Sequence, residues 1–127
     1  MKFDRRQAII GGVLAVGACA HTSTGAESMY GLIGKMTAKT GQRDALIAVL
    51  LDGVAGMPGC FSYVVAQDPV DADAIWITEV WDSEESHKAS LALPSVRDAI
   101  AKGRPMIAGM EAGHVTRPVG GHGLARA

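Results

Sequence analysis

The chain has 127 residues, of which 48% are hydrophobic and 20% charged, and this size and composition suit one small globular domain. The formal net charge is -1, which argues against nucleic acid as a partner, because a surface that binds phosphates needs an excess of basic residues. The 16 glycines have no regular period and no internal repeat is visible, so a repeat protein is not expected.

Residues 1–20 have the pattern of a signal peptide. Lys2, Arg5 and Arg6 form a basic start, and an apolar run of about ten residues follows, which is too short to span a bilayer. The paired arginines suggest the twin-arginine export route. The alternative is a buried N-terminal helix. The charge order favours export, so we expect a periplasmic protein.

The end of this segment fits two patterns. Ala18-Cys19-Ala20 has the small residues of an ordinary cleavage site, which would make His21 the first residue. The same stretch resembles a bacterial lipobox, in which Cys19 would carry a lipid. We expect no membrane association unless Cys19 is lipidated, and a flexible linker over residues 21–28.

The folded domain is expected to open with a strand over residues 29–38. Tyr30 and Met36 fall on one face with the other even-numbered residues, because successive side chains of a strand point to opposite sides. Thr40 is predicted to cap the next element, a helix. Apolar residues recur at helical spacing between residues 46 and 54, so this helix should lay one face on the sheet.

Two further strands are predicted over residues 60–67 and 74–81, joined by a polar loop. Both faces of the second are mostly apolar, so it should be central in the sheet and covered on both sides. Glu79 is the exception, because an unpaired buried carboxylate is costly. We expect it to pair with an arginine across the dimer or to orient a substrate hydroxyl, and the sequence favours the pair. The candidate arginines are Arg97, Arg104 and Arg117.

A short helix follows the central strand directly. Ser83 can cap it, and Glu84 and Glu85 lie in its first turn, where the helix dipole favours negative charge. His87 follows one turn further on. A buried strand therefore leads into a helix that carries the best-placed histidine of the chain.

Pro94 is well placed to start another helix, which Pro105 interrupts or kinks before further apolar residues. A last, short strand is expected over residues 112–118. The domain therefore spans residues 29–118, and a glycine-rich tail over residues 119–127 follows it. This tail either packs on the protein with Leu124 buried and His122 at the rim of a pocket, or frays in solvent.

The order of elements is β-α-β-β-α-β, which predicts an α+β fold of the ferredoxin-like type. Two helices cover one face of a four-stranded sheet, whereas the other face would be wet in a monomer. Because both faces of the central strand carry large apolar residues, we expect a homodimer packed sheet to sheet.

The chain resembles the antibiotic biosynthesis monooxygenase family, also called the quinol monooxygenases. The resemblance covers about residues 29–123 and rests on the order of several short matches. They are Thr40-Gly41-Gln42-Arg43, Pro58-Gly59-Cys60-Phe61-Ser62-Tyr63, Glu79-Val80-Trp81-Asp82-Ser83, the segment Leu91 to Ile100, and Pro118-Val119-Gly120-Gly121-His122-Gly123. The resemblance implies a dimeric α/β barrel with a pocket between sheet and helices in each subunit. Some members oxidise quinols or phenols with oxygen and no cofactor, whereas others degrade haem.

The chain departs from the family at two positions. Ser90 and Ser95 stand where many members carry histidines, so only His87 remains on this part of the chain. The haem-degrading branch also uses an asparagine, and this chain contains none. Haem degradation is therefore not expected.

Five residues are candidates for the site. His87 is the candidate catalytic base, because an unperturbed imidazole titrates near neutral pH; the alternative is a solvated helix residue. Trp76 and Trp81 point to opposite faces, so one of them can line an aromatic-substrate pocket while the other belongs to the core. Tyr63 can donate a hydrogen bond into the pocket, and His122 is a further candidate from the tail.

Two hypotheses about function follow. The first is an oxygenase without a cofactor that acts on a quinol or phenolic aromatic, with a small aromatic substrate and oxygen as its partners. The second is a non-catalytic dimeric binder of small aromatic ligands, which the serines at positions 90 and 95 favour. The four histidines have no metal-ligand spacing and no glycine-rich phosphate loop precedes a helix, so neither a metal nor a cofactor is expected.

Overall fold

The computed structural model describes residues 28–124. The predicted signal peptide, nearly all of the predicted linker and the last three residues lie outside this range. The elements are β1 (Tyr30–Ala38), α2 (Arg43–Gly53), β2 (Cys60–Gln67), β3 (Ala74–Trp81), α3 (Glu84–Ser90), α4 (Pro94–Gly103), the 3-10 turn η1 (Arg104–Met106), β4 (Ile107–Met110) and β5 (His114–Thr116). Within the described range, no helix has the length and apolar character needed to cross a membrane.

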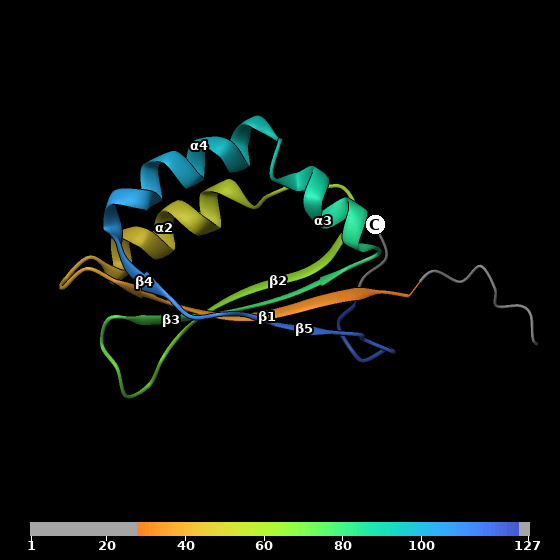
Figure 1. Cartoon of the computed structure of the whole chain (residues 1–127), viewed down its shortest axis with the longest axis horizontal. Helices are drawn as coiled ribbons and strands as arrows, with labels where there is room; N and C mark the ends of the chain where they lie inside the picture. The colour runs from red at the N-terminus through yellow and green to blue at the C-terminus, as the bar shows by residue number, and fades with distance from the viewer. Residues whose placement is uncertain (1–27, 125–127) are drawn as a thin grey trace, which may run out of the picture.

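The strands form one antiparallel sheet in the order β2-β3-β1-β4. Strand β5 also pairs with β1, at the start of β1, whereas β4 pairs with its end. Helices α2 and α4 lie side by side over one face of this sheet, and α3 sits over its end (Figure 1). This is the predicted α+β ferredoxin-like arrangement, with β3 in a central position. The fold prediction is confirmed.

The pairing register of β1 and β3 decides which side chains face the helices. Leu32 lies opposite Glu79, and Met36 opposite Ile75. Residues directly opposite each other point to the same side of a sheet. The face that carries Ile75 also carries Glu79 and Trp81, because they lie at even spacing along β3. One carboxylate therefore shares the helix-covered face with buried apolar side chains.

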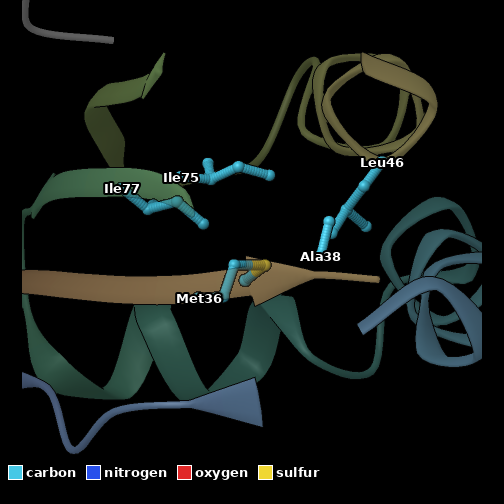
Figure 2. Close-up of a cluster of buried hydrophobic side chains, with 5 residues drawn as sticks. All are labelled: Met36, Ala38, Leu46, Ile75 and Ile77. Carbon is cyan, nitrogen blue, oxygen red and sulfur yellow. The ribbon is translucent and has the colours of Figure 1, made fainter. Parts of the chain in front are cut away.

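The core on this face consists of two clusters. The first joins Leu46 of α2 to four residues of β1 and β3 (Figure 2), and Leu46 is only 1% exposed. The second lies at the other end of β3, where Trp81 packs with Met57 and Val96 and is fully buried. The helices thus pack on the sheet at two clusters, one toward each end of β3.

Local signals set several element boundaries as predicted. The hydroxyl of Ser83 accepts a hydrogen bond from the backbone N–H of Ser86 at 3.1 Å, which caps α3. Pro94 occupies the first turn of α4. The predicted bounds of β2 and β3 agree with the structure.

The predicted cap of the first helix was wrong. Helix α2 begins at Arg43 with Gln42 at its N-cap, and no side chain caps it. Thr40 instead belongs to a tight turn, in which the N–H of Gln42 donates to the carbonyl of Lys39 at 2.9 Å. Gly41 takes a φ of 80° in this turn, a conformation that glycine adopts at little cost.

The segment after α4 also differs from the prediction. One short strand was expected over residues 112–118, whereas two strands, β4 and β5, pair with β1. The turn at Pro105 ends the helix, so Ile107 enters the sheet instead of extending a helical face. Between the two strands the N–H of Glu111 still donates to the carbonyl of Lys35 at 3.0 Å.

No element of residues 28–124 covers the second face of the sheet. Ile33 and Val64 point to this side and are 36% and 52% exposed. Thr78 on β3 is exposed there as well. The structure thus shows β3 covered on the helix side, and the expected cover of its other face by a second copy stays a prediction.

Candidate functional site

A cavity of about 590 Å³ lies between the helix-covered face of the sheet and the helices. This volume is in the range of cavities that hold drug-sized ligands. Apolar side chains from α2, α4 and the sheet make up most of its wall. Tyr63, Glu79, Trp81, His87 and Ser90 line one end of it, and the charged residues Lys35, Arg104 and Glu111 line it elsewhere.

The centre of this polar end is the carboxylate of Glu79. Its Oε2 accepts a hydrogen bond from the indole N–H of Trp81 at 2.8 Å and lies 3.9 Å from Nε2 of His87. The strand pleat places Glu79 and Trp81 on one face, and the Ser83 cap starts α3 so that His87 returns over the end of the strand. Sequence neighbours thereby become a compact group of a carboxyl, an indole and an imidazole.

Burial changes the acid–base character of this group. It raises the pKa of Glu79 above its ordinary value, while the N–H of Trp81 and the nearby His87 act in the opposite direction. The pKa of Tyr63 is also raised, first by burial and then by the negative charge of Glu79. Tyr63 therefore keeps its proton at neutral pH and is available as a hydrogen-bond donor.

Packing fixes the orientation of His87. Its ring lies 5.4 Å from the ring of Tyr30 and 5.4 Å from that of Trp81, the latter in an edge-on arrangement. The hydroxyl of Ser90 donates to the backbone carbonyl of His87 at 2.6 Å. The side chain is 19% exposed. His87 is thus a held imidazole at the cavity wall and not a solvated helix residue.

A model of the antibiotic biosynthesis monooxygenase family matches residues 29–102. The chain belongs to this family. A crystal structure of a protein from Chloroflexus aurantiacus J-10-fl that bears the same family name is 73% identical, covers 77% of this chain and 100% of its own, and has a TM-score of 0.76. A search of curated proteins finds no match.

Two more distant structures that bear the family name support the fold alone. The protein from Caulobacter crescentus CB15 is 19% identical over 75% of this chain and 93% of its own, with a TM-score of 0.68. The protein from Nitrosomonas europaea is 15% identical over 72% and 90%, with a TM-score of 0.67. The ferredoxin-like architecture of the family therefore persists at low sequence identity.

The structure brings three of the five predicted site residues of this family member together. Tyr63, Trp81 and His87 all line the cavity. His122 is exposed on the tail and is not part of the cavity wall. Of the two tryptophans left open by the sequence, Trp81 is the one beside the candidate base.

Trp76 lies on the opposite face of the sheet. Its indole N–H donates to Oδ2 of Asp68 at 2.8 Å, and the ammonium of Lys35 lies 5.2 Å from its ring centroid. Backbone N–H groups of Asp71 and Val70 together with the Trp76 indole lower the pKa of Asp68 to about 2. Trp76 therefore anchors a polar network on the uncovered face.

No arginine pairs with Glu79 within the described residues, and the expected pair with an arginine across a dimer stays a prediction. The groups that face its carboxylate are the indole of Trp81 and the imidazole of His87. The contact between Trp81 and Glu79 could have been predicted from the sequence, because the two residues are two positions apart and lie on the same face of the strand. The packing of Tyr30 against His87 was missed, since nothing local links the start of β1 to α3.

Ser90 and Ser95, which stand where many family members carry histidines, have different surroundings. Ser90 is buried and its hydroxyl is hydrogen-bonded to the backbone, whereas Ser95 is exposed and outside the cavity wall.

Cys60 is half-buried, and burial raises the pKa of its thiol, which disfavours a nucleophilic thiolate. Among residues 28–124, no group of three or more His, Cys, Asp or Glu residues is arranged to hold a metal ion.

Proposed function

We propose that this chain is a monooxygenase that oxidises a quinol or a related phenolic aromatic with molecular oxygen and without a cofactor. The observation that carries the proposal is the group of Tyr63, Glu79 and His87 at one end of an apolar cavity in a member of this family. A phenol needs a base and hydrogen-bond donors for its oxygen, and an apolar wall for its ring. The cavity offers all of these.

The first step in this proposal is removal of a phenolic proton. The imidazole of His87 accepts the proton, and the Glu79 carboxylate at 3.9 Å stabilises the imidazolium that forms. Tyr63 donates a hydrogen bond to the phenolate oxygen. The apolar wall excludes water, so the anion is less solvated and its electrons are more available to oxygen.

The overall reaction balances without an outside reductant. A benzenediol and one oxygen molecule give a hydroxylated benzoquinone and one water. The ring loses four electrons, one oxygen atom forms a new C–O bond, and the other leaves as water when the O–O bond breaks. The substrate itself supplies the electrons, which is why the proposal needs no cofactor.

Oxygen uptake with a panel of benzenediols and naphthols tests the proposal. We expect uptake with the wild-type chain and a loss of at least about 100-fold in His87→Ala, the usual scale for a general base. His114→Ala is the matched control, because His114 is exposed on β5 and outside the cavity wall. Absence of uptake by the wild type, or equal rates in His87→Ala, would contradict the proposal.

The alternative function, a non-catalytic binder of small aromatic ligands, has one observation in its favour. The hydroxyl of Ser90 is engaged with the backbone of His87, so it offers no second reacting group where many family members carry a histidine. A binder would show a ligand-dependent rise in melting temperature. Such a rise without oxygen uptake would favour this alternative over the enzyme.

We also propose that the protein is an exported homodimer that packs through the uncovered face of the sheet. Exposed apolar side chains on this face, such as Ile33 and Val64, support the interface. Val64→Asp would bury an unpaired charge there and should yield monomers in light scattering. A monomeric wild type at micromolar concentration would refute the dimer.

Export is tested separately, by mass spectrometry of the secreted protein, which shows whether the chain is cleaved after Ala20.

A further inference from the structure

The cavity extends well beyond the polar group that contains His87. Along β1 its floor runs from Leu32 to Met36, a distance of about 13 Å for four residues of a strand. Leu32 lies opposite Glu79, whereas Met36 lies four pairs further along, opposite Ile75. The polar group thus occupies one end, and the other end reaches the first core cluster.

The far part of the cavity has a wall of mostly apolar side chains. Leu46 and Leu50 of α2, Ile77 of β3 and Ile107 of β4 line it. We call this part the apolar arm. The whole cavity has the liquid volume of about 20 water molecules. A bare benzenediol has eight non-hydrogen atoms and would leave the arm unfilled.

Gly34 lies on the floor between the polar end and the apolar arm. It pairs with Ile77 and lines the cavity between Leu32 and Met36. A Cβ atom at this position would meet no atom within 4 Å, and the residue has no positive φ. The protein therefore leaves room for a Cβ at this position, and a side chain there would take up cavity space that a ligand otherwise uses.

The arm also has an apolar route toward solvent. Ile100 of α4 and Met110 of β4 both line the cavity and are 40% and 68% exposed. A chain that leaves the polar end and passes Gly34 would therefore meet these apolar side chains, while the charged side chains of Lys35, Arg104 and Glu111 also line the cavity near Met36, Ile107 and Met110.

We propose that the ligand is a hydroxylated aromatic ring that carries an apolar chain, and that Gly34 is the residue that admits this chain into the apolar arm. The identity of the ring rests on the proposed function, whereas the chain rests on the length and lining of the cavity alone. Gly34 is thus a specificity-determining residue, and it takes no part in proton transfer.

Binding of para-alkylphenols with methyl, propyl and hexyl chains, measured by calorimetry on the wild-type protein, tests the inference. We expect the affinity to rise about fourfold for each added methylene, the ratio that corresponds to ~0.8 kcal/mol. In Gly34→Val this gain should disappear, so that hexylphenol binds at least about tenfold more weakly than to the wild type. The affinity for methylphenol should change by less than about threefold.

Gly109→Val is the matched control. Gly109 is also a strand glycine with open space around a Cβ and no positive φ, but it does not line the cavity. This variant should keep the full dependence on chain length. Gly34→Ala should show a partial loss, and it provides a second reading if the valine variant fails to give a cooperative melt.

The outcomes separate this inference from the proposed function. Affinities that do not depend on chain length, or an equal dependence in Gly34→Val and the wild type, would overturn the apolar arm as a binding site. Chain-dependent binding without uptake of oxygen by any alkylated benzenediol would uphold the ligand class and refute the oxygenase. Oxygen uptake with benzenediols, together with affinities that do not depend on chain length, would uphold the oxygenase and refute the apolar arm.

Discussion

Replacement of Trp81 by phenylalanine is the sharpest test of the electrostatics at the polar end. Trp81 is fully buried, and its N–H is the 2.8 Å donor to Oε2 of Glu79. Phenylalanine keeps an aromatic ring at the site but removes this donor. The carboxylate of Glu79 is then left with His87 at 3.9 Å as its remaining polar contact in the described chain.

The expected cost depends on pH, because the lost bond is stronger when Glu79 is ionised. Burial raises the pKa of Glu79 above the ordinary value of 4.5. A raised carboxyl pKa contributes stability that is complete below the ordinary value and is lost as the pH rises through the folded-state value. Without the Trp81 N–H the pKa rises further, so the loss of stability at alkaline pH becomes larger.

The magnitude follows from the two kinds of hydrogen bond. A bond to a charged group contributes about 1.5–3 kcal/mol, and a neutral bond about 0.5–1.5 kcal/mol. Trp81→Phe should therefore cost about 1–1.5 kcal/mol more at about pH 8 than at about pH 3.5, beyond a packing cost common to both. Urea unfolding at the two pH values measures the difference.

Glu79→Gln supplies the control for this prediction. The amide oxygen of glutamine still accepts a hydrogen bond but does not titrate. In that background the cost of Trp81→Phe should be independent of pH, and the double-mutant cycle should isolate the coupling between the two side chains. Equal costs at both pH values in the otherwise wild-type chain would refute the reasoning.

Three further predictions concern stability. Leu46→Ala should cost about 3–5 kcal/mol, because Leu46 is 1% exposed in the first core cluster; a loss below 1 kcal/mol in thermal unfolding would contradict this core. The lowered pKa of Asp68, about 2, means that its contribution is present above the ordinary value of 3.8 and fades as the pH falls toward 2. The difference in stability between the wild type and Asp68→Ala should therefore shrink in acid, and a constant difference from pH 7 to 2 would argue against it. Arg43→Ala should speed hydrogen exchange in residues 68–74, because the guanidinium donates to three carbonyls of this loop at 3.0–3.3 Å; unchanged exchange there would refute that role.

Local chemistry was sufficient for the parts of the fold that depend on neighbours in the chain. Alternation in residues 60–67 and 74–81 predicted β2 and β3 because the period of a strand is a local property. The Ser83 cap and Pro94 were readable for the same reason, since each acts within one helical turn. The order of these elements was enough to predict the ferredoxin-like class.

The candidate site could be predicted only in part. The sequence identified His87 as the base candidate and showed that Trp76 and Trp81 occupy opposite faces of one strand. Which face lies under the helices depends on how α2 and α4 pack, and this is a non-local property. The structure shows that Trp81 is the tryptophan of the cavity wall, because it is buried beside His87. Trp76 instead donates a hydrogen bond to Asp68 on the uncovered face.

Tertiary structure alone decided the partner of Glu79 and the shape of the cavity. Burial predicted that this carboxylate needs a partner, but burial does not say which group the folded chain brings within reach. Within the described residues these groups are His87 and Trp81. The path of the cavity past Gly34 likewise depends on the register of β1 and β3 and on the helices above them. The sequence by itself determined the elements and the polar residue types of the site. Their distances came from packing between segments far apart in the chain, which no local pattern encodes.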